Sequence, residues 1–139
     1  YLSTCYVYPG LKGNYAENSP LLPINNYAWS KLGGECAVQM YGNSLILRAS
    51  ITEKPFVHES AFLDFKTNFI FHEDLIPGII KIINKKGVVN VGGVSRSVYN
   101  FAKKYNPKIK KIYAKKFYGN DTRINLTMNI AKFKKYIND

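Results

Sequence analysis

Short apolar runs alternate along the chain with longer segments of helical spacing, and turn residues separate them. The pattern predicts a strand over residues 2–8, stopped by Pro9-Gly10, and a second strand over the apolar run 44–49. Further short strands are expected at residues 69–71, 88–91 and 111–114. Continuous apolar runs of this length are typical of parallel strands buried on both faces. The alternation of strands with helices indicates an α/β fold.

Helices are predicted where apolar residues recur at helical spacing between capping residues. One is expected from Tyr27 to Met40, and a second over residues 75–86, with Asp74 as its N-cap and Gly87 as its end. Ser95 or Ser97 can cap a third helix that runs to about Tyr105, and residues 129–137 form the last. Of the connecting segments, residues 9–26 are expected to be an irregular loop. Residues 50–67 are expected to be mobile, with a possible short helix around Ser60–Asp64.

Candidate chemistry appears at the start of the first expected helix. Tyr27 and Lys31 are four residues apart, so a helix places them one above the other. A nearby ammonium favours the anionic form of a phenol, which lets a tyrosine exchange a proton with a carbonyl or hydroxyl near neutral pH. A Thr hydroxyl from a separate strand could hold the same substrate oxygen. The spacing alone is a weak signal, because Tyr and Lys are both abundant here.

The surrounding sequence makes this pattern specific. Ser3-Thr4-Cys5-Tyr6-Val7-Tyr8 precedes it, Tyr27-Ala28-Trp29-Ser30-Lys31 carries it, and Leu47-Arg48-Ala49-Ser50 and Val89-Asn90-Val91-Gly92-Gly93 follow. This arrangement resembles the extended short-chain dehydrogenase/reductase superfamily, and within it the dTDP-4-dehydrorhamnose reductase (RmlD-like) branch of sugar-nucleotide enzymes. The resemblance implies an oxidoreductase of carbohydrate biosynthesis that uses NADP or NAD to reduce a nucleotide-activated 4-keto sugar.

The resemblance also implies roles for single residues. Thr4 would hydrogen-bond the sugar oxygen, Tyr27 would protonate it as the general acid, and Lys31 would bind the nicotinamide ribose. The substrate would be lined by Thr4, Cys5 and Tyr6, and the cofactor would be bound by Tyr27, Lys31, Arg48, Ala49 and Ser50. Two departures put the rhamnose substrate in doubt: Cys5 stands where the family usually has Asp, and Ile51 where rhamnose reductases have a Trp. A sugar-nucleotide epimerase or dehydratase, or a non-catalytic regulatory subunit of this branch, stays open.

The resemblance further predicts which part of the fold the chain forms. In this superfamily a Gly-rich turn after the first strand binds the pyrophosphate of the dinucleotide, and we find no such turn in this sequence. Gly92-Gly93 cannot replace it, because a third glycine at the required spacing is missing. We therefore expect the C-terminal portion of a Rossmann-like parallel sheet plus a small α/β substrate-binding portion. Residues 1–50 would carry the catalytic groups, and residues 51–139, intermixed with the sheet, would bind substrate. The partners implied are a missing N-terminal cofactor-binding half, whose absence would expose an apolar sheet edge, and possibly a second copy of the chain.

Composition narrows the remaining classes. The 139 residues carry 20 basic and 9 acidic side chains, a net charge of +11. Lysines gather at 103–116 and 132–135, which favours a solvated surface, with a funnel for a nucleotide sugar or a nucleic-acid site as alternatives. Nucleic acid is not an expected partner. A membrane is not expected either, since no apolar run is long enough to span a bilayer. Two cysteines suit a reducing cytoplasmic compartment, and isolated His58 and His72 give no metal-binding pattern.

Overall fold

A computed structural model of the chain describes residues 1–120 and 122–139. Its centre is a parallel sheet in the order β1–β2–β7, formed by Leu2–Thr4, Leu45–Ala49 and Gly87–Val91. Leu2 pairs with Leu47, and Leu47 pairs with Val89, so the carboxyl ends of the three strands meet at one edge. This confirms the expected parallel sheet of α/β type, and β1 lies at its open side with Leu2 exposed.

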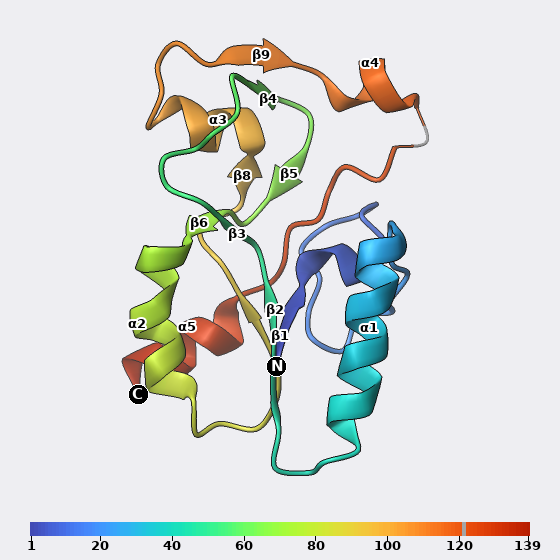
Figure 1. Ribbon diagram of the computed structural model, residues 1–139, viewed down its shortest axis with the longest axis vertical. Coiled ribbons are helices and arrows are strands. Elements are labelled where there is room, and N and C mark those ends of the chain that lie inside the picture. The colour runs from blue at the N-terminus through green and yellow to red at the C-terminus, as the bar shows by residue number, and fades with distance from the viewer. Residues whose placement is uncertain (121) are drawn as a thin grey trace.

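Helices cover both faces of this sheet (Figure 1). Helix α1 (Asn26–Gln39) packs on one face, and α2 (His72–Ile82) and α5 (Ala131–Asn138) pack on the other. The apolar core under α2 and α5 is formed by Leu47, Ala49, Leu75, Ile82, Val89, Val91 and Phe133. Burial of these apolar side chains supplies the main stabilisation of this layer. Because α2, β7 and α5 all follow residue 50, the later half of the chain contributes to the central sheet as well.

A smaller lobe lies beyond the carboxyl ends of the strands, at the top of Figure 1. Strands β4 (Ser60–Phe62) and β9 (Lys110–Ile112) pair in parallel, and β5 (Lys66–Thr67) pairs antiparallel with β8 (Arg96–Ser97). Strands β3 (Ile51–Thr52) and β6 (Ile70–Phe71) pair in parallel where the two lobes join. Helices α3 (Val98–Lys103) and α4 (Ala114–Tyr118) complete this lobe.

Three predictions of local structure were wrong in extent or type. The expected strand 2–8 stops at Thr4 and becomes a 3-10 turn at Cys5–Val7, because the Thr4 hydroxyl accepts the Tyr6 N–H and caps that turn. The possible helix at Ser60–Asp64 is instead strand β4, since pairing with β9 outweighs local preference. The last predicted strand begins one residue earlier, at Lys110.

Helix boundaries also differ from those predicted. Asp74 is not an N-cap: α2 begins at His72 after Phe71, and Asp74 lies in the first turn, where a carboxylate favours the helix dipole. The same helix ends at Ile82 rather than at residue 86, and Gly87, with a φ of 82°, opens strand β7. Ser97 caps α3 as predicted, because its hydroxyl accepts the Asn100 N–H.

None of the helices formed by residues 1–120 and 122–139 is long and apolar enough to cross a membrane.

Candidate active site

A small cavity of about 170 Å³ opens where the carboxyl ends of β1 and β2 meet the start of α1. Its walls bring together seven of the predicted site residues: Thr4, Cys5, Tyr6, Tyr27, Lys31, Ala49 and Ser50. Leu2, Ser3, Ile51 and Phe69 complete the lining. Residues from three separate segments therefore converge on one space, as the resemblance implies for a reaction site.

Thr4 reaches this cavity because β1 ends there. Its hydroxyl oxygen accepts a hydrogen bond from the Tyr6 N–H at 3.2 Å, which holds the side chain at the mouth of the turn. A hydroxyl that accepts one bond still has its own hydrogen to donate. Thr4 is thus arranged to donate to an oxygen atom of a molecule bound in the cavity.

Tyr27 and Lys31 lie on successive turns of α1, which begins at Asn26. The helix is capped by Asn25, whose side-chain oxygen accepts the Ala28 N–H at 2.8 Å. The Tyr27 ring is 55% exposed and meets the Tyr6 ring edge to face, with 6.5 Å between ring centres. The Lys31 ammonium lies 4.6 Å from the centre of the Tyr1 ring. Both groups are therefore supported by neighbouring aromatic rings and remain open to a bound molecule.

Two further groups of the cavity are held in their neutral forms. Burial raises the pKa of the Cys5 thiol, whose sulfur is 3.9 Å from Thr67 Oγ1, and Thr67 Oγ1 lies 2.6 Å from Ser50 Oγ. Burial, with smaller contributions from Cys5 and Tyr27, raises the pKa of Tyr6 to about 12. Near neutral pH the cavity thus contains a thiol and a phenol as hydrogen-bond donors.

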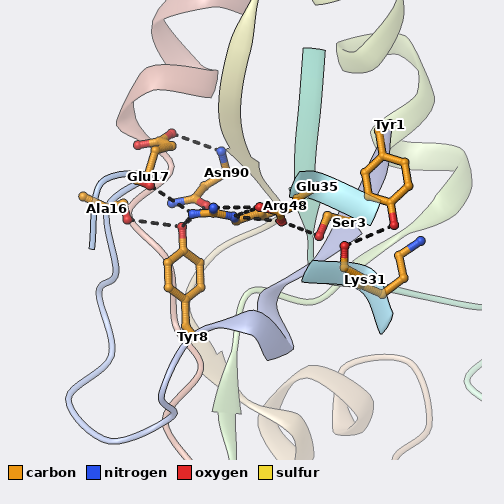
Figure 2. A network of polar contacts seen from close by, with 9 residues as sticks. All are labelled: Tyr1, Ser3, Tyr8, Ala16, Glu17, Lys31, Glu35, Arg48 and Asn90. Carbon is orange, nitrogen blue, oxygen red and sulfur yellow. Dashed lines mark hydrogen bonds and ion pairs between the residues drawn. The ribbon is translucent and has the colours of Figure 1, made fainter. Parts of the chain in front are cut away.

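Arg48 does not line this cavity, although it follows the predicted cofactor-binding pattern. Its side chain is buried beneath α1, where Nε and Nη2 donate to the Glu35 carboxylate (Figure 2). Its Nη1 donates to the Tyr8 hydroxyl and to the Glu17 carbonyl oxygen, each at 3.0 Å. The structure assigns Arg48 to the scaffold that joins β2, α1 and the loop after β1. Its predicted contact with the cofactor stays a prediction.

The buried network around Arg48 is the part of the site that the sequence analysis missed. Glu35 also accepts a hydrogen bond from the Ser3 hydroxyl, while the Tyr8 hydroxyl donates to the Asn90 side chain at 2.7 Å. The spacing could have revealed Glu35, because it lies four residues after Lys31 in the row that begins with Tyr27. A carboxylate buried on this side of α1 needs a cation beside it, and Arg48 on β2 provides that charge.

A second cavity of about 760 Å³ lies next to the first, between the smaller lobe and the residues around Tyr6, Ile24 and Asn25. Tyr6 and Phe69 line both cavities, so the two spaces adjoin. Its wall contains aromatic side chains and a few polar groups, among them Phe56, His58, Phe62, Phe65, Tyr118 and Arg123. A volume of this size accommodates an organic ligand of several rings.

Within residues 1–120 and 122–139, no cluster of three or more His, Cys, Asp or Glu side chains could hold a metal ion.

Comparison with known proteins tests the family resemblance of the segment that forms the small cavity. Residues 1–58 match the family model of the RmlD substrate binding domain. That span includes Thr4, Tyr27 and Lys31, so the resemblance predicted from the sequence is confirmed over the segment that forms the small cavity. No curated protein sequence matches the chain.

Solved structures extend the likeness to nearly the whole chain. A hypothetical dTDP-4-dehydrorhamnose reductase from Sulfolobus tokodaii is 25% identical, with a TM-score of 0.80 over 96% of this chain and 56% of its own. A dTDP-4-dehydrorhamnose reductase from Bacillus anthracis in complex with NADP is 24% identical, with a TM-score of 0.75 over 92% of this chain and 54% of its own.

An enzyme with a different activity has the same fold. UDP-glucuronic acid 4-epimerase from Bacillus cereus, in complex with NAD, is 20% identical, with a TM-score of 0.71 over 99% of this chain and 52% of its own. At this identity the likeness shows the fold alone. The chain spans about half the length of these solved structures, and it has the Rossmann-like α/β fold expected from its sequence.

Proposed function

We propose that this chain carries the proton-transfer groups and the substrate cavity of an NAD(P)H-dependent reductase of a nucleotide-activated 4-keto sugar. The observation that supports this most directly is the convergence of Thr4, Tyr27 and Lys31 on one small cavity. The proposal is also supported by the match of residues 1–58 to the RmlD substrate binding domain and by relatives that bind NADP or NAD. The two unpaired cysteines fit a reducing, cytoplasmic setting.

The side chains of the small cavity can share the work of reducing a carbonyl group. Bound NADPH or NADH supplies the hydride. Tyr27 donates its phenolic proton to the substrate oxygen, and Thr4 donates a hydrogen bond to the same oxygen. Lys31, one turn along α1, lines the same cavity, and its ammonium can donate hydrogen bonds to ribose hydroxyls. Ala49 and Ser50 form the wall opposite α1, where the nicotinamide would be held.

The large cavity suits the rest of a nucleotide-activated sugar. Its aromatic side chains offer faces for a sugar or a base, and Tyr6 and Phe69 mark its junction with the small cavity. Arg123 is held there because its guanidinium donates to the carbonyl oxygens of Leu22 and Pro23 at 2.8 and 3.0 Å. A fixed guanidinium on the wall provides a positive charge for a diphosphate.

An epimerase of the same superfamily is the second candidate, because the same tyrosine can remove and return a proton while hydride leaves and comes back. Dehydration is less well supported. Elimination of water requires one group to take a proton from carbon and another to protonate the departing hydroxyl. Among the described residues that line the small cavity, Cys5 occupies the place of the family carboxylate and no side chain is acidic. A regulatory subunit without turnover is the remaining alternative.

Cofactor stoichiometry separates these functions. The cofactor-bound enzyme is supplied with a nucleotide-activated 4-keto sugar, and NADPH or NADH absorbance at 340 nm is followed together with product formation. A reductase oxidises one equivalent of cofactor for each product formed. Product without net cofactor oxidation would show an epimerase, and substrate binding with no product in any condition would overturn the enzymatic proposal.

A further inference from the structure

Seven exposed lysines occupy one strip of the smaller lobe: Lys103, Lys104, Lys108, Lys110, Lys111, Lys115 and Lys116. No acidic residue occurs between positions 103 and 118. Ion pairs among the described residues join Arg48 to Glu35 and Lys54 to Glu73, and neither includes a lysine of this strip. Asp64, whose carboxylate accepts the backbone N–H groups of Ala114 and Lys115, and Glu59, whose carbonyl oxygen accepts the Lys110 N–H, are acidic residues beside these lysines. Seven lysines against these two carboxylates leave a net positive surface, which we call the lysine strip.

The elements that carry the lysine strip also form a wall of the large cavity. Strand β9, which contains Lys110 and Lys111, pairs with β4 and contributes Ile112 to the cavity lining. Helix α4, which contains Lys115 and Lys116, ends at Tyr118, and Tyr118 lines the same cavity. Figure 1 places β9 and α4 together along the outer border of the lobe. The lysine strip thus lies on elements that also wall the proposed substrate cavity, although none of its lysines lines that cavity.

We infer that the lysine strip attracts the anionic diphosphate of the substrate and raises its rate of entry into the large cavity. This inference rests on the proposed function, because it takes the large cavity as a nucleotide-sugar site. Like charges at the rim of a low-dielectric cleft focus the field on its mouth and increase the local concentration of an anion. The strip lacks arginine, and base recognition in nucleic acids depends chiefly on arginine forks, so a small anion fits it better than a polynucleotide.

Steering acts on the association rate, and a pair of matched variants can measure it. In one variant Lys110, Lys111 and Lys116 are changed to Gln. In the control, Lys86, Lys134 and Lys135, which are exposed at the opposite end of the molecule beside α2 and α5, are changed to Gln. Both variants lower the net charge by three. Stopped-flow fluorescence then follows binding of N-methylanthraniloyl-UDP and its dTDP counterpart to the full chain at several salt concentrations.

The strip variant is expected to associate about threefold or more slowly at low salt, with an unchanged dissociation rate and a shallower salt dependence. The control variant should associate at close to the wild-type rate. Equal slowing in both variants, or a change confined to the dissociation rate, would overturn the steering inference while the cavity remains a nucleotide site. Absence of saturable nucleotide binding by the wild-type chain would instead overturn the proposed function.

The same proteins distinguish a polynucleotide surface. An oligothymidylate titration of the wild type and the strip variant is carried out over the same salt range. The inference would be overturned in favour of a nucleic-acid surface by a combination of three results. The oligonucleotide would bind the wild type more tightly than the nucleoside diphosphate does, this binding would fall steeply with salt, and the strip variant would lose it. Weak oligonucleotide binding that is equal in both proteins supports it.

Discussion

The guanidinium of Arg48 and the carboxylate of Glu35 form a buried, two-pronged ion pair, with Nε and Nη2 of Arg48 at 3.0 and 2.8 Å from the two carboxylate oxygens. This pair joins the carboxyl end of β2 to the third turn of α1 (Figure 2). Glu35 shares a helix row with Tyr27 and Lys31, so the ion pair sets the rotation of α1 that turns those two residues toward the small cavity. The helix that carries the proposed catalytic groups is thus held to the sheet through Glu35, a buried residue of its third turn.

Replacing Glu35 with Gln should destabilise the fold strongly. The change removes the negative charge and leaves the Arg48 guanidinium buried without its counter-charge, which typically costs about 3–5 kcal/mol. Urea unfolding of the chain measures the free energy of unfolding directly. In the cofactor-bound enzyme, residual folded protein should also show a lower kcat, because α1 loses its fixed rotation.

The matched control is Glu73→Gln. Glu73 forms an exposed ion pair with Lys54 at 3.9 Å, and such pairs contribute about 0–1 kcal/mol. Unfolding free energies that fall equally for Glu35→Gln and Glu73→Gln would contradict the role assigned to the buried pair.

Cys5 should be far less reactive than Cys36. Cys5 is buried and burial raises the pKa of its thiol, whereas Cys36 is exposed on α1. Iodoacetamide at pH 8, followed by peptide mass spectrometry, should alkylate Cys36 at least about tenfold faster in the native chain, because only the thiolate reacts. In urea the two rates should converge. Equal rates in the native chain would show that Cys5 is open to solvent.

Tyr6 should make the fold sensitive to alkaline pH. Its pKa is raised to about 12 from an ordinary value near 10, so the folded state favours the protonated phenol. This contribution to stability is fully present below about pH 10 and is lost as the pH rises toward 12. Between pH 10 and 11 the loss should be roughly 1 kcal/mol. The free energy of unfolding in urea should therefore fall more steeply with rising pH for the wild type than for Tyr6→Phe. Equal slopes would refute the raised pKa of Tyr6.

The central sheet and the meeting of the candidate site residues could be predicted because their signals are local. The apolar run 44–49 gave β2 almost to the residue, and the segments around Thr4, Tyr27 and Lys31 placed those groups in one cavity. Parallel strands end at a common edge, so residues following them meet even when they are distant in sequence. Family resemblance added the assignment of roles.

The errors come from long-range interactions that no local pattern contains. Ser60–Phe62 forms a strand only because Lys110–Ile112 lies beside it, fifty residues later. The ion pair of Arg48 was also not predicted, because its partner Glu35 lies on another element. The large cavity is likewise built from segments between Tyr6 and Arg123, so its volume could not be derived from any one of them.

Lys31→Ala should weaken cofactor binding as well as turnover. The substitution removes the positive charge one turn from Tyr27 and leaves the helix intact, since alanine is the strongest helix former. NADPH fluorescence titration of the assembled enzyme should show a raised Kd, and kcat should fall by about tenfold or more. Lys12→Ala, which removes a lysine outside both cavities, serves as the control. A Lys31→Ala enzyme with unchanged Kd and kcat would exclude Lys31 from the site.

The central claim is that Tyr27 transfers the proton to the substrate oxygen. It is tested most directly by measuring turnover of Tyr27→Phe with a nucleotide-activated 4-keto sugar and NADPH in the cofactor-bound enzyme. Tyr41→Phe, which alters an exposed phenol outside both cavities, is the matched control. Loss of a general acid predicts a fall in kcat of at least about a hundredfold for Tyr27→Phe alone, with substrate binding retained. A fall of less than about tenfold, or an equal fall in both variants, would contradict the account.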